Sequence, residues 1–361
     1  MKNKVLTIIV PSYNMEAFLP KCLGSLIVAP ELMAWLEVLV VNDGSKDRTS
    51  EIARDFAAKW PGTFKVIDKA NGHYGSCINV GIAESSGEYI KILDADDYFS
   101  VDAFRIYLGF LLDLCDHPKD DFRQPDMVWN DFAFVDEKLR LNRVCRRCPK
   151  GFDVVDIEDA RVRLDGLYMH QVAYRSSLLK SMKYRQIEGI CYTDNQWCQE
   201  PVAFAGTVAY CPVVLYNYLV GRSGQSVSVE AWRKNLWMLG KVAQHMTRFA
   251  CDADIKSDKV RLYADNCVMT ILSKFYDIAL MVIHSKDSDK MLSDFDDELR
   301  RLSPHFHQRL EDSMVSKRIG FRYLSVWRKT RNSSSLKFAA FRAYRRLVGM
   351  CCGNMRRTDW L

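Results

Sequence analysis

The first hundred residues alternate between short apolar runs and segments with helical spacing, and this alternation restricts the fold more than any other feature of the sequence. Strands are expected in the apolar runs 6–10, 37–41, 64–67 and 89–93. Helices are expected between them, at 15–26, 47–59 and 75–84. Strands that alternate with helices favour a parallel sheet with helices against it. The sequence therefore predicts an α/β fold with a mostly parallel, doubly wound sheet.

Polar, loop-favouring residues follow the expected strands at their carboxyl ends. Ser12, Tyr13 and Asn14 follow the first strand, residues 42–45 follow the second, and a group of aspartates follows the fourth. The carboxyl ends of parallel strands meet at one edge of a sheet, and open α/β sheets bind their ligands there. We therefore expect these side chains to share one rim.

The fourth strand runs directly into Asp94, Asp96 and Asp97. In an extended chain the side chains alternate between faces, so Asp94 and Asp96 should point the same way and Asp97 the opposite way. Two carboxylates this close need a cation, a proton or an open, solvated rim, and a divalent ion with oxygen ligands is the usual solution. The alternative is a solvated acidic turn that caps the next helix.

A rim of this kind has the chemistry to bind a nucleotide diphosphate. Tyr13 offers an aromatic face to a base, and Asp43 can accept a hydrogen bond from a base or a ribose. Segment 69–75 precedes a helix, whose first N–H groups can bind an anion. No G-x-G-x-x-G follows the first strand and no G-x-x-x-x-G-K-[ST] occurs, which argues against a nicotinamide enzyme and a P-loop ATPase.

Taken together, these motifs resemble those of family 2 glycosyltransferases in order and spacing over about the first hundred residues. They are VPSYNME at 10–16, VNDGS at 41–45 with Asp47 and Thr49, NGHYGS at 71–76 with Asn79 and Gly81, and the segment 87–97. The resemblance implies a GT-A fold and a nucleotide-sugar donor, with a UDP-hexose or UDP-N-acetylhexosamine as the default.

The resemblance also implies roles for single residues on the donor side. These are Pro11, Tyr13 and Glu16 in the nucleotide pocket, Asp43 on the base, Lys69 and Asn79 along the donor site, Asp94 with Ala95 next to ribose or sugar, and Asp96 on Mg²⁺ or Mn²⁺.

Asp194 is the candidate catalytic base. In family 2 enzymes an acidic residue before a helix, at about this distance from the metal motif, takes the acceptor proton, often as the second of two acids. Thr193 stands where the first acid would be, so only Asp194 can act. The alternative is a helix N-cap, for which Asp is among the best residues. Arg222, in a segment at 220–226 that also resembles part of these enzymes, is predicted to bind the donor pyrophosphate.

From residue 229 the pattern becomes helical, with helices expected at 232–249, 259–283 and 288–302. We expect a GT-A domain at 1–226, a C-terminal α-helical region at 227–315 and a basic tail at 316–361. The GT-A domain would divide into a nucleotide-sugar-binding half at 1–110 and an acceptor half at 111–226. No apolar run is expected to reach the length of a membrane span, because Lys274 and Asp277 interrupt the most apolar window at 271–283.

The tail carries twelve basic residues and one acidic residue. Apolar residues recur every three or four positions in its second half, which is typical of a basic amphipathic helix on an anionic membrane surface. The same spacing fits a helix docked on its own protein, and no module for nucleic acid accompanies the charge. We expect no nucleic-acid partner and a cytoplasmic protein, peripheral at the inner face of the cell membrane.

The twelve cysteines are scattered and are expected to be reduced, with Cys145 and Cys148 too few for a structural zinc site. The resemblance to family 2 enzymes implies an inverting, metal-dependent glycosyltransferase that acts on a glycan or lipid-linked glycan. Two alternatives remain open: a nucleotidyltransferase, which would release pyrophosphate, and a noncatalytic module that binds a nucleotide sugar or a glycan.

Overall fold

The computed structural model describes residues 4–116, 124–222, 225, 228–316 and 319–351. The chain folds as two compact units. Unit 1 comprises residues 1–222 and 255–260, and unit 2 comprises residues 223–254 and 261–361. The tail at 316–361 therefore belongs to the same unit as most of the helical region before it.

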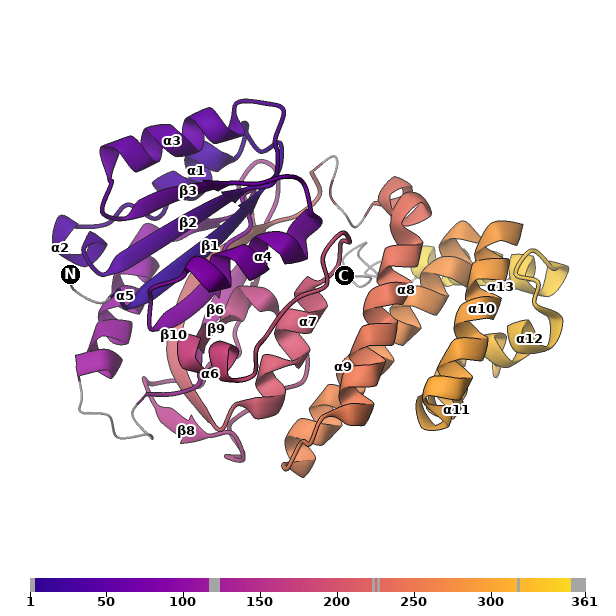
Figure 1. Ribbon diagram of the computed structural model, residues 1–361. Helices are drawn as coiled ribbons and strands as arrows, with labels where there is room; N and C mark the ends of the chain where they lie inside the picture. Colours follow the sequence, from indigo (N-terminus) through magenta and orange to yellow (C-terminus); the bar gives the residue numbers. More distant parts are fainter. Residues whose placement is uncertain (1–3, 117–123, 223–224, 226–227, 317–318, 352–361) are drawn as a thin grey trace. The chain divides into compact units, whose positions relative to one another are not determined.

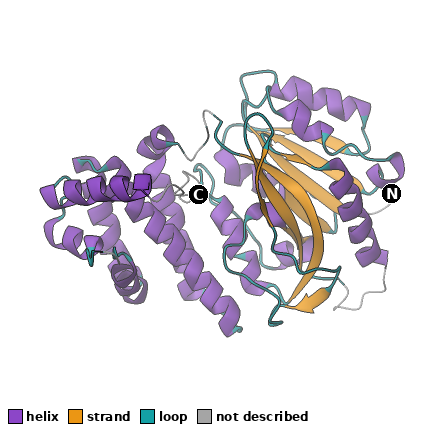
Figure 2. Ribbon diagram, turned by 180° about the vertical axis from the view of Figure 1, so that it is seen from behind, coloured by secondary structure: helices purple, strands orange, loops and turns teal. Residues whose placement is uncertain are grey.

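Unit 1 is built on a curled sheet, drawn in orange in Figure 2. The described residues form ten strands: β1 (Leu6–Ser12), β2 (Leu36–Asn42), β3 (Phe64–Asp68), β4 (Tyr89–Ile92), β5 (Tyr98–Phe99), β6 (Met127–Val135), β7 (Leu141–Cys145), β8 (Val154–Asp156), β9 (Val172–Arg175) and β10 (Thr207–Leu219). Their order in the sheet is β3-β2-β1-β4-β9-β6-β10-β5, with β7 paired to β6 and β8 to β10.

The pairing shows how the two halves of the sheet differ. Strands β3, β2, β1 and β4 run parallel, as the alternation with helices predicts. Strand β9 pairs antiparallel with β4 on one side and with β6 on the other, whereas β6 and β10 run parallel. The predicted mostly parallel sheet is thus confirmed in the first half, and the second half is mixed. A 3₁₀ turn, Met169–Gln171, directly precedes β9.

Helices pack against this sheet (Figure 1). They are α1 (Leu19–Gly24), α2 (Pro30–Met33), α3 (Thr49–Lys59), α4 (His73–Glu84), α5 (Val101–Asp116), α6 (Ser176–Ser181) and α7 (Asp194–Gln199). The central strands carry consecutive apolar residues because both of their faces are covered. All residues of β4 are buried, including Lys91.

Lys91 is a charged residue inside the core. Its Nζ donates to Asn130 Oδ1 at 2.8 Å and to the carbonyl oxygen of His170 at 3.1 Å. Burial lowers the pKa of Lys91 to about 7, because the charged amine loses its hydration. Burial and the nearby Lys91 also lower the pKa of His170 to about 3.

Unit 2 is helical. Its elements are α8 (Val229–Asp252), α9 (Asp258–Asp277) with a π-helical continuation (Ile278–Ile283), α10 (Lys286–Leu302), α11 (Pro304–Ser313), α12 (Tyr323–Thr330) and α13 (Leu336–Cys351). Its core includes Tyr276, whose hydroxyl donates to the buried Asp296 at 2.7 Å. Arg328 donates to the same carboxylate at 2.9 Å, which compensates for the burial of its charge.

One helix, Asp258–Ile283, is long and apolar enough to cross a membrane, with a mean hydropathy of 1.5. The expectation that no segment would reach this threshold is therefore wrong, because Lys274 and Asp277 are too few to offset the surrounding apolar residues. Just over half of the apolar window, 56%, is buried inside the structure, and the core helix of a folded domain meets the same criterion. The ring of Phe275 packs against Phe295, as in a core helix.

The basic tail packs within unit 2. Phe338 and Phe341 on α13 are buried, and Phe341 contacts the ring of Phe321. Arg342 donates to the carbonyl oxygen of Ser333 at 2.8 Å, and Arg345 lies 3.6 Å from a carboxylate oxygen of Asp277. These contacts fit the alternative in which the tail helix docks on its own protein. Four tail cations, at 317, 318, 356 and 357, lie outside the described residues.

Candidate active site

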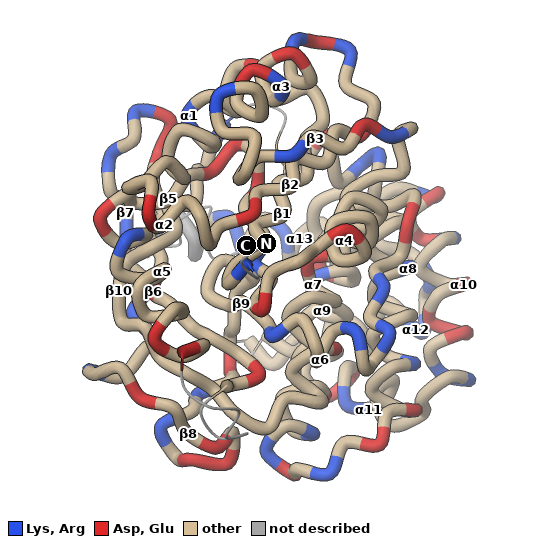
Figure 3. Tube along the Cα trace, turned by 60° about the vertical axis from the view of Figure 1, so that its left-hand side comes forward, with Lys and Arg blue, Asp and Glu red and all other residues tan. Residues whose placement is uncertain are grey.

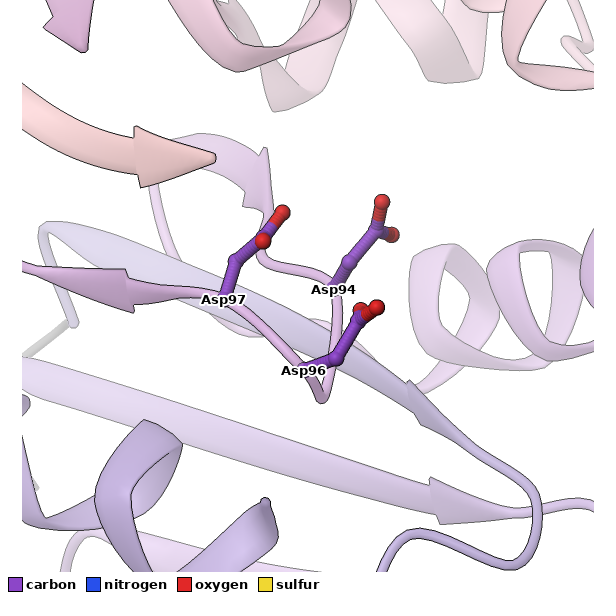
Figure 4. Close-up of side chains that lie close together, drawn as sticks. All are labelled: Asp94, Asp96 and Asp97. Atoms are coloured by element: carbon purple, nitrogen blue, oxygen red, sulfur yellow. The ribbon is translucent and has the colours of Figure 1, made fainter. Parts of the chain in front are cut away.

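Three aspartate carboxylates meet at the end of β4, as Figure 4 shows. The N–H of Asp97 donates to the carbonyl oxygen of Asp94 at 3.0 Å, so the segment 94–97 is a tight turn with Ala95 and Asp96 at its centre. One oxygen of each carboxylate lies within 4.8 Å of the other two. The expectation that Asp97 would point away is wrong, because the alternation of faces holds only while the chain is extended.

Two residues of strand β10 hold the buried carboxylate of Asp97 in place. Tyr216 donates its hydroxyl to Asp97 Oδ2 at 2.6 Å, and the N–H of Leu219 donates to Oδ1 at 2.7 Å. Tyr216 also accepts the N–H of Asp94 at 3.1 Å. Strand β10 therefore fixes both ends of the aspartate turn.

Burial and like charge act together on this turn. Burial, followed by the charge of Asp96, raises the pKa of Asp94 to about 7. Burial and the two neighbouring aspartates raise the pKa of Asp97 as well. Tyr74 donates its hydroxyl to Asp94 Oδ1 at 2.8 Å, which offsets part of this effect.

The aspartate turn has the donor set that a hard divalent cation requires. Mg²⁺ and Mn²⁺ prefer carboxylate oxygens, and the close approach of three carboxylates is unfavourable without a cation or a proton. Asp94 and Asp97 accept hydrogen bonds from neutral groups, namely tyrosine hydroxyls and a backbone N–H. Asp96 instead faces a cation, with its Oδ2 2.6 Å from Nε of Arg222. The residues present therefore fit a divalent ion, with Arg222 as the cation that faces Asp96 in this structure.

Arg222 thus reaches the aspartate turn, as the sequence interpretation requires of a group that binds pyrophosphate. Both side chains of the Arg222–Asp96 pair are largely buried, and the guanidinium also lies over the ring of Phe18. Residues 223–224 and 226 of the segment predicted with Arg222 lie outside the described residues.

The donor side of the rim is organised by Asp43. Its buried carboxylate accepts from Lys69 Nζ at 2.7 Å and from the N–H of Gly72 at 2.9 Å. Lys69 donates to Ser76 Oγ at 2.8 Å, so these contacts link β2, the segment after β3 and the start of α4. Asp43 and Lys69 therefore lie together, at the edge where the sequence places a nucleotide.

The residues after β1 complete this side. The ring of Tyr13 is 46% exposed, as a stacking surface for a base must be, and Pro11 is half-buried at the end of the strand. Glu16 accepts the N–H of Arg48 at 2.9 Å and donates its own N–H to Asp47 at 3.0 Å. Glu16 thus also fastens the loops after β1 and β2 to each other.

Asn79 uses its amide on a different partner. Its Nδ2 donates to the carbonyl oxygen of Gln186 at 2.9 Å, and its Oδ1 accepts the N–H of Gln186 at 2.8 Å. Nδ2 also lies 2.9 Å from Glu188 Oε1. Gly75, on the same helix, has no room for a side chain because a Cβ atom would clash with the carbonyl oxygen of Ile187. Helix α4 therefore holds the segment 186–189, which leads to Asp194.

Asp194 is the first residue of α7, and Thr193 occupies the N-cap position without a side-chain capping bond. The N–H of Ile187 donates to Gln196 Oε1 at 3.0 Å, so the segment held by Asn79 in turn holds this helix. The charge of Asp194 acts on both Asp94 and the hydroxyl of Tyr74. The structure thus places the predicted base close enough to the predicted metal motif for its charge to raise the pKa of Asp94, which lies 100 residues earlier in the sequence.

Two tyrosines at this site were not singled out in the sequence. Tyr74 contacts Asp94 directly. Burial and the charges of Asp97, Asp94 and Asp194 raise the pKa of Tyr218, which lies against His170. Tyr74 could have been found from its place inside the 71–76 motif, whereas nothing local distinguishes Tyr218 from a core residue.

The comparisons with known proteins agree with this geometry. The model of the family described as glycosyl transferase family 2 matches residues 7–140. These residues form a family 2 glycosyltransferase domain. The match contains the aspartate turn, Asp43 and Asn79, and it confirms the family predicted from the sequence.

Curated relatives show how far the similarity of this family 2 domain extends. Glycosyltransferase EpsJ of Bacillus subtilis is 42% identical over 101 residues, which is 28% of this chain and 28% of that protein. The glycosyltransferase named MG060 homolog of Mycoplasma pneumoniae is 26% identical over 270 residues, 74% of this chain and 81% of that protein. The first three curated matches span about a third of the relatives' own length.

Among solved structures, TarS of S. aureus (residues 1–349, in complex with UDP-GlcNAc) has a TM-score of 0.65 at 18% identity. The similarity covers 95% of this chain and 92% of that chain. It confirms the predicted GT-A fold with a C-terminal helical extension, because it includes the helices that follow the family 2 domain.

Proposed function

We propose that this protein transfers a sugar from a nucleotide diphosphate sugar to a hydroxyl group of a glycan or lipid-linked glycan. The observation that carries the proposal is the grouping of the aspartate turn, the Asp43–Lys69 pair and Asp194 in unit 1. Segment 72–74 joins the first two, because Gly72 donates to Asp43 and Tyr74 donates to Asp94, and the charge of Asp194 acts on Asp94. The Asp43–Lys69 pair would bind the nucleotide, the aspartate turn would hold the cation on the diphosphate, and Asp194 would take the proton of the acceptor hydroxyl.

The donor is proposed to be a UDP sugar, with its base on the exposed ring of Tyr13 and its uracil hydrogen-bonded to Asp43. The complex of TarS with UDP-GlcNAc supports this choice. Lys69 neutralises Asp43 and so keeps a charged carboxylate stable inside the rim. Arg222 suits the pyrophosphate, because a guanidinium binds phosphate oxygens with two parallel N–H groups.

A divalent cation, Mg²⁺ or Mn²⁺, would be held by Asp96 with Asp94 and Asp97. When bound, it supplies positive charge that stabilises the departing diphosphate. Tyr216 and Leu219 keep Asp97 in place, and Tyr74 orients Asp94, so the carboxylates are arranged before any ligand arrives.

Asp194 is proposed to be the catalytic base. Its carboxylate takes the proton of the acceptor hydroxyl while that oxygen forms a bond to the anomeric carbon. The bond from this carbon to the diphosphate oxygen breaks on the opposite side, and the diphosphate leaves with the electron pair. Attack opposite to the leaving group inverts the configuration at the anomeric carbon.

The test is release of nucleoside diphosphate from a panel of nucleotide sugars, with Mn²⁺, with Mg²⁺ and with EDTA. We expect metal-dependent release from one donor, abolished in Asp96→Asn and reduced about a hundredfold or more in Asp194→Asn. Release of pyrophosphate would indicate a nucleotidyltransferase instead. Donor binding without release, unchanged in Asp194→Asn even with a lipid extract as acceptor source, would indicate a binding module.

The acceptor and the place of action follow from the same proposal. One relative, GgaB of Bacillus subtilis, is named a minor teichoic acid biosynthesis protein and is 32% identical over 108 residues. That name supports a surface polymer, or its lipid-linked precursor, as the acceptor. Such acceptors are assembled at a membrane, so we propose that this protein works in the cytoplasm at the inner face of the cell membrane.

A further inference from the structure

A strongly basic hairpin lies at the rim of the candidate active site. It joins β6 to β7 and continues to residue 150. Residues 136–150 contain six basic and two acidic side chains. The two acids stand at its start, and one of them, Asp136, already pairs with Arg140 at 2.6 Å. Arg146 and Arg147 face the carboxylates of Asp131 and Asp165 outside the hairpin, at 4.0 and 3.8 Å. The hairpin still has a positive net charge, and Figure 3 shows lysine and arginine positions in blue near β7.

The hairpin adjoins the aspartate turn. The N–H of Leu219 donates to Asp97, and the next residue, Val220, donates its N–H to the carbonyl oxygen of Val135 at 2.9 Å. Val135 is the last residue of β6, so the chain leaves the sheet for the hairpin beside the residue that holds Asp97. The tip of the hairpin thus lies at the edge of the sheet that carries the active-site groups.

Two leucines at the tip are exposed among these charges. Leu139 is 49% exposed and Leu141 is 62% exposed. Leu139 also has a φ of 60°, a left-handed conformation that bulky residues rarely adopt. Glycine or asparagine would suit this turn better, and a polar residue would suit water better. An exposed leucine in a strained turn serves neither folding nor solubility, and strain of this kind marks functional segments.

Basic side chains around exposed apolar ones are the combination that binds an anionic lipid surface. The cations are attracted to the headgroups, and the leucines enter the boundary of the acyl chains. Lys138 and Arg143 flank the two leucines and are exposed. A soluble polyanion would use the cations but leaves the leucines without a role, so the observations favour a membrane over a polymer.

The structure also argues against the surface expected from the sequence. The aromatic residues that would insert from the tail, Phe338 and Phe341, are buried inside unit 2. Of α13, Leu336 and Leu347 remain exposed, at 88% and 58%. These two leucines give a matched comparison for the hairpin.

We propose that the hairpin at 136–150 is the membrane-contacting surface of this protein, and that it binds anionic lipid through Leu139, Leu141 and the cations around them. This inference rests on the proposed function only in placing the acceptor at a membrane. Contact through the hairpin brings the rim with the aspartate turn to the lipid surface, where a lipid-linked acceptor would enter.

The experiment is co-flotation of the full chain with mixed phosphatidylglycerol and phosphatidylcholine vesicles. We expect binding that weakens with salt and falls at least about tenfold in Leu139→Ser/Leu141→Ser, with the melting temperature unchanged. The matched variant Leu336→Ser/Leu347→Ser should bind like the parent. Lys138→Gln/Arg143→Gln should bind more weakly and with a smaller dependence on salt.

Several results would overturn the inference. Vesicle binding that survives the hairpin leucine substitutions, or that is lost with the tail substitutions, would place the contact elsewhere. Binding of soluble polyphosphate without binding of vesicles would make the hairpin a polyanion surface. Release of nucleoside diphosphate, measured without vesicles on the same variants, separates this inference from the proposed function: intact release with failed lipid binding refutes only the hairpin.

Discussion

Replacing Asn79 by alanine should lower turnover and leave donor affinity unchanged. The sequence interpretation places Asn79 along the donor site. In the structure its amide instead binds the backbone of Gln186 on both sides, at 2.9 and 2.8 Å, and reaches Glu188. Ile187, in the same segment, holds Gln196 on the helix that begins with Asp194. We therefore expect loss of the amide to act on Asp194, the proposed catalytic base, before it acts on the donor.

The magnitude follows from the groups that Asn79→Ala leaves without partners. Gln186 is buried, so its N–H and carbonyl groups each lose a hydrogen bond that costs about 1–3 kcal/mol to leave unmade. A total of roughly 2–6 kcal/mol is enough to detach the segment locally. A displacement of about 1 Å at a catalytic group can cost on the order of a hundredfold in rate. We expect kcat to fall between about tenfold and a hundredfold.

Two measurements test this prediction. Calorimetric titration with the donor should give a Kd within about threefold of the parent, while the rate of nucleoside diphosphate release falls. Thr63→Val is the matched control, because it also removes a buried hydrogen bond from a side chain to a backbone carbonyl, at 3.0 Å to Met33, in the same unit. A large rise in Kd with unchanged kcat would refute the reasoning and restore the donor-site role of Asn79.

Three further predictions concern charged groups of unit 1. The pKa of Lys91 in the folded protein is about 7, so above this pH the folded state loses the proton while the unfolded state keeps it up to its ordinary pKa. The free energy of unfolding should therefore rise with pH above about 7, by up to about 1.4 kcal/mol per pH unit. Urea titrations of Lys91→Met should lack this rise. Asp97→Asn replaces one of two accepting oxygens by a donor, which should cost about 1–3 kcal/mol in thermal unfolding experiments, and an unchanged melting temperature would contradict the role given to Tyr216 and Leu219. Arg222→Ala should strengthen Mn²⁺ binding in the absence of nucleotide, because Arg222 neutralises Asp96, and should weaken donor affinity; calorimetry that shows neither effect would remove Arg222 from the site.

The sequence alone predicts most of the first half of unit 1. The alternation of apolar runs and helical segments predicts the four parallel strands, because each element has its own periodicity and can be read over a few residues. The polar residues at the strand ends predict the rim, because parallel strands end at one edge. Asp43 and Lys69 lie together there, and Asp94 and Asp96 lie at the end of the expected strand.

Other features depend on contacts that local pattern does not encode. The turn that brings Asp97 to its neighbours is held by Tyr216 and Leu219, more than a hundred residues away. The second half of the sheet is mixed because β9 inserts between β4 and β6 in antiparallel orientation, and periodicity gives no strand direction. Arg222 meets Asp96 for the same reason: only the complete sheet brings the end of β10 beside the end of β4.

The basic tail and Asn79 show the same division. The sequence determined that α13 is amphipathic and basic, but an apolar stripe looks identical whether it meets lipid or protein, and only the packing of Phe338 and Phe341 distinguishes the two. The sequence likewise determined that Asn79 lies in the helix that follows the segment beginning at Lys69. Only the tertiary structure decided that its amide binds Gln186, 107 positions further along, because hydrogen bonds between distant segments form where packing brings the backbone within reach.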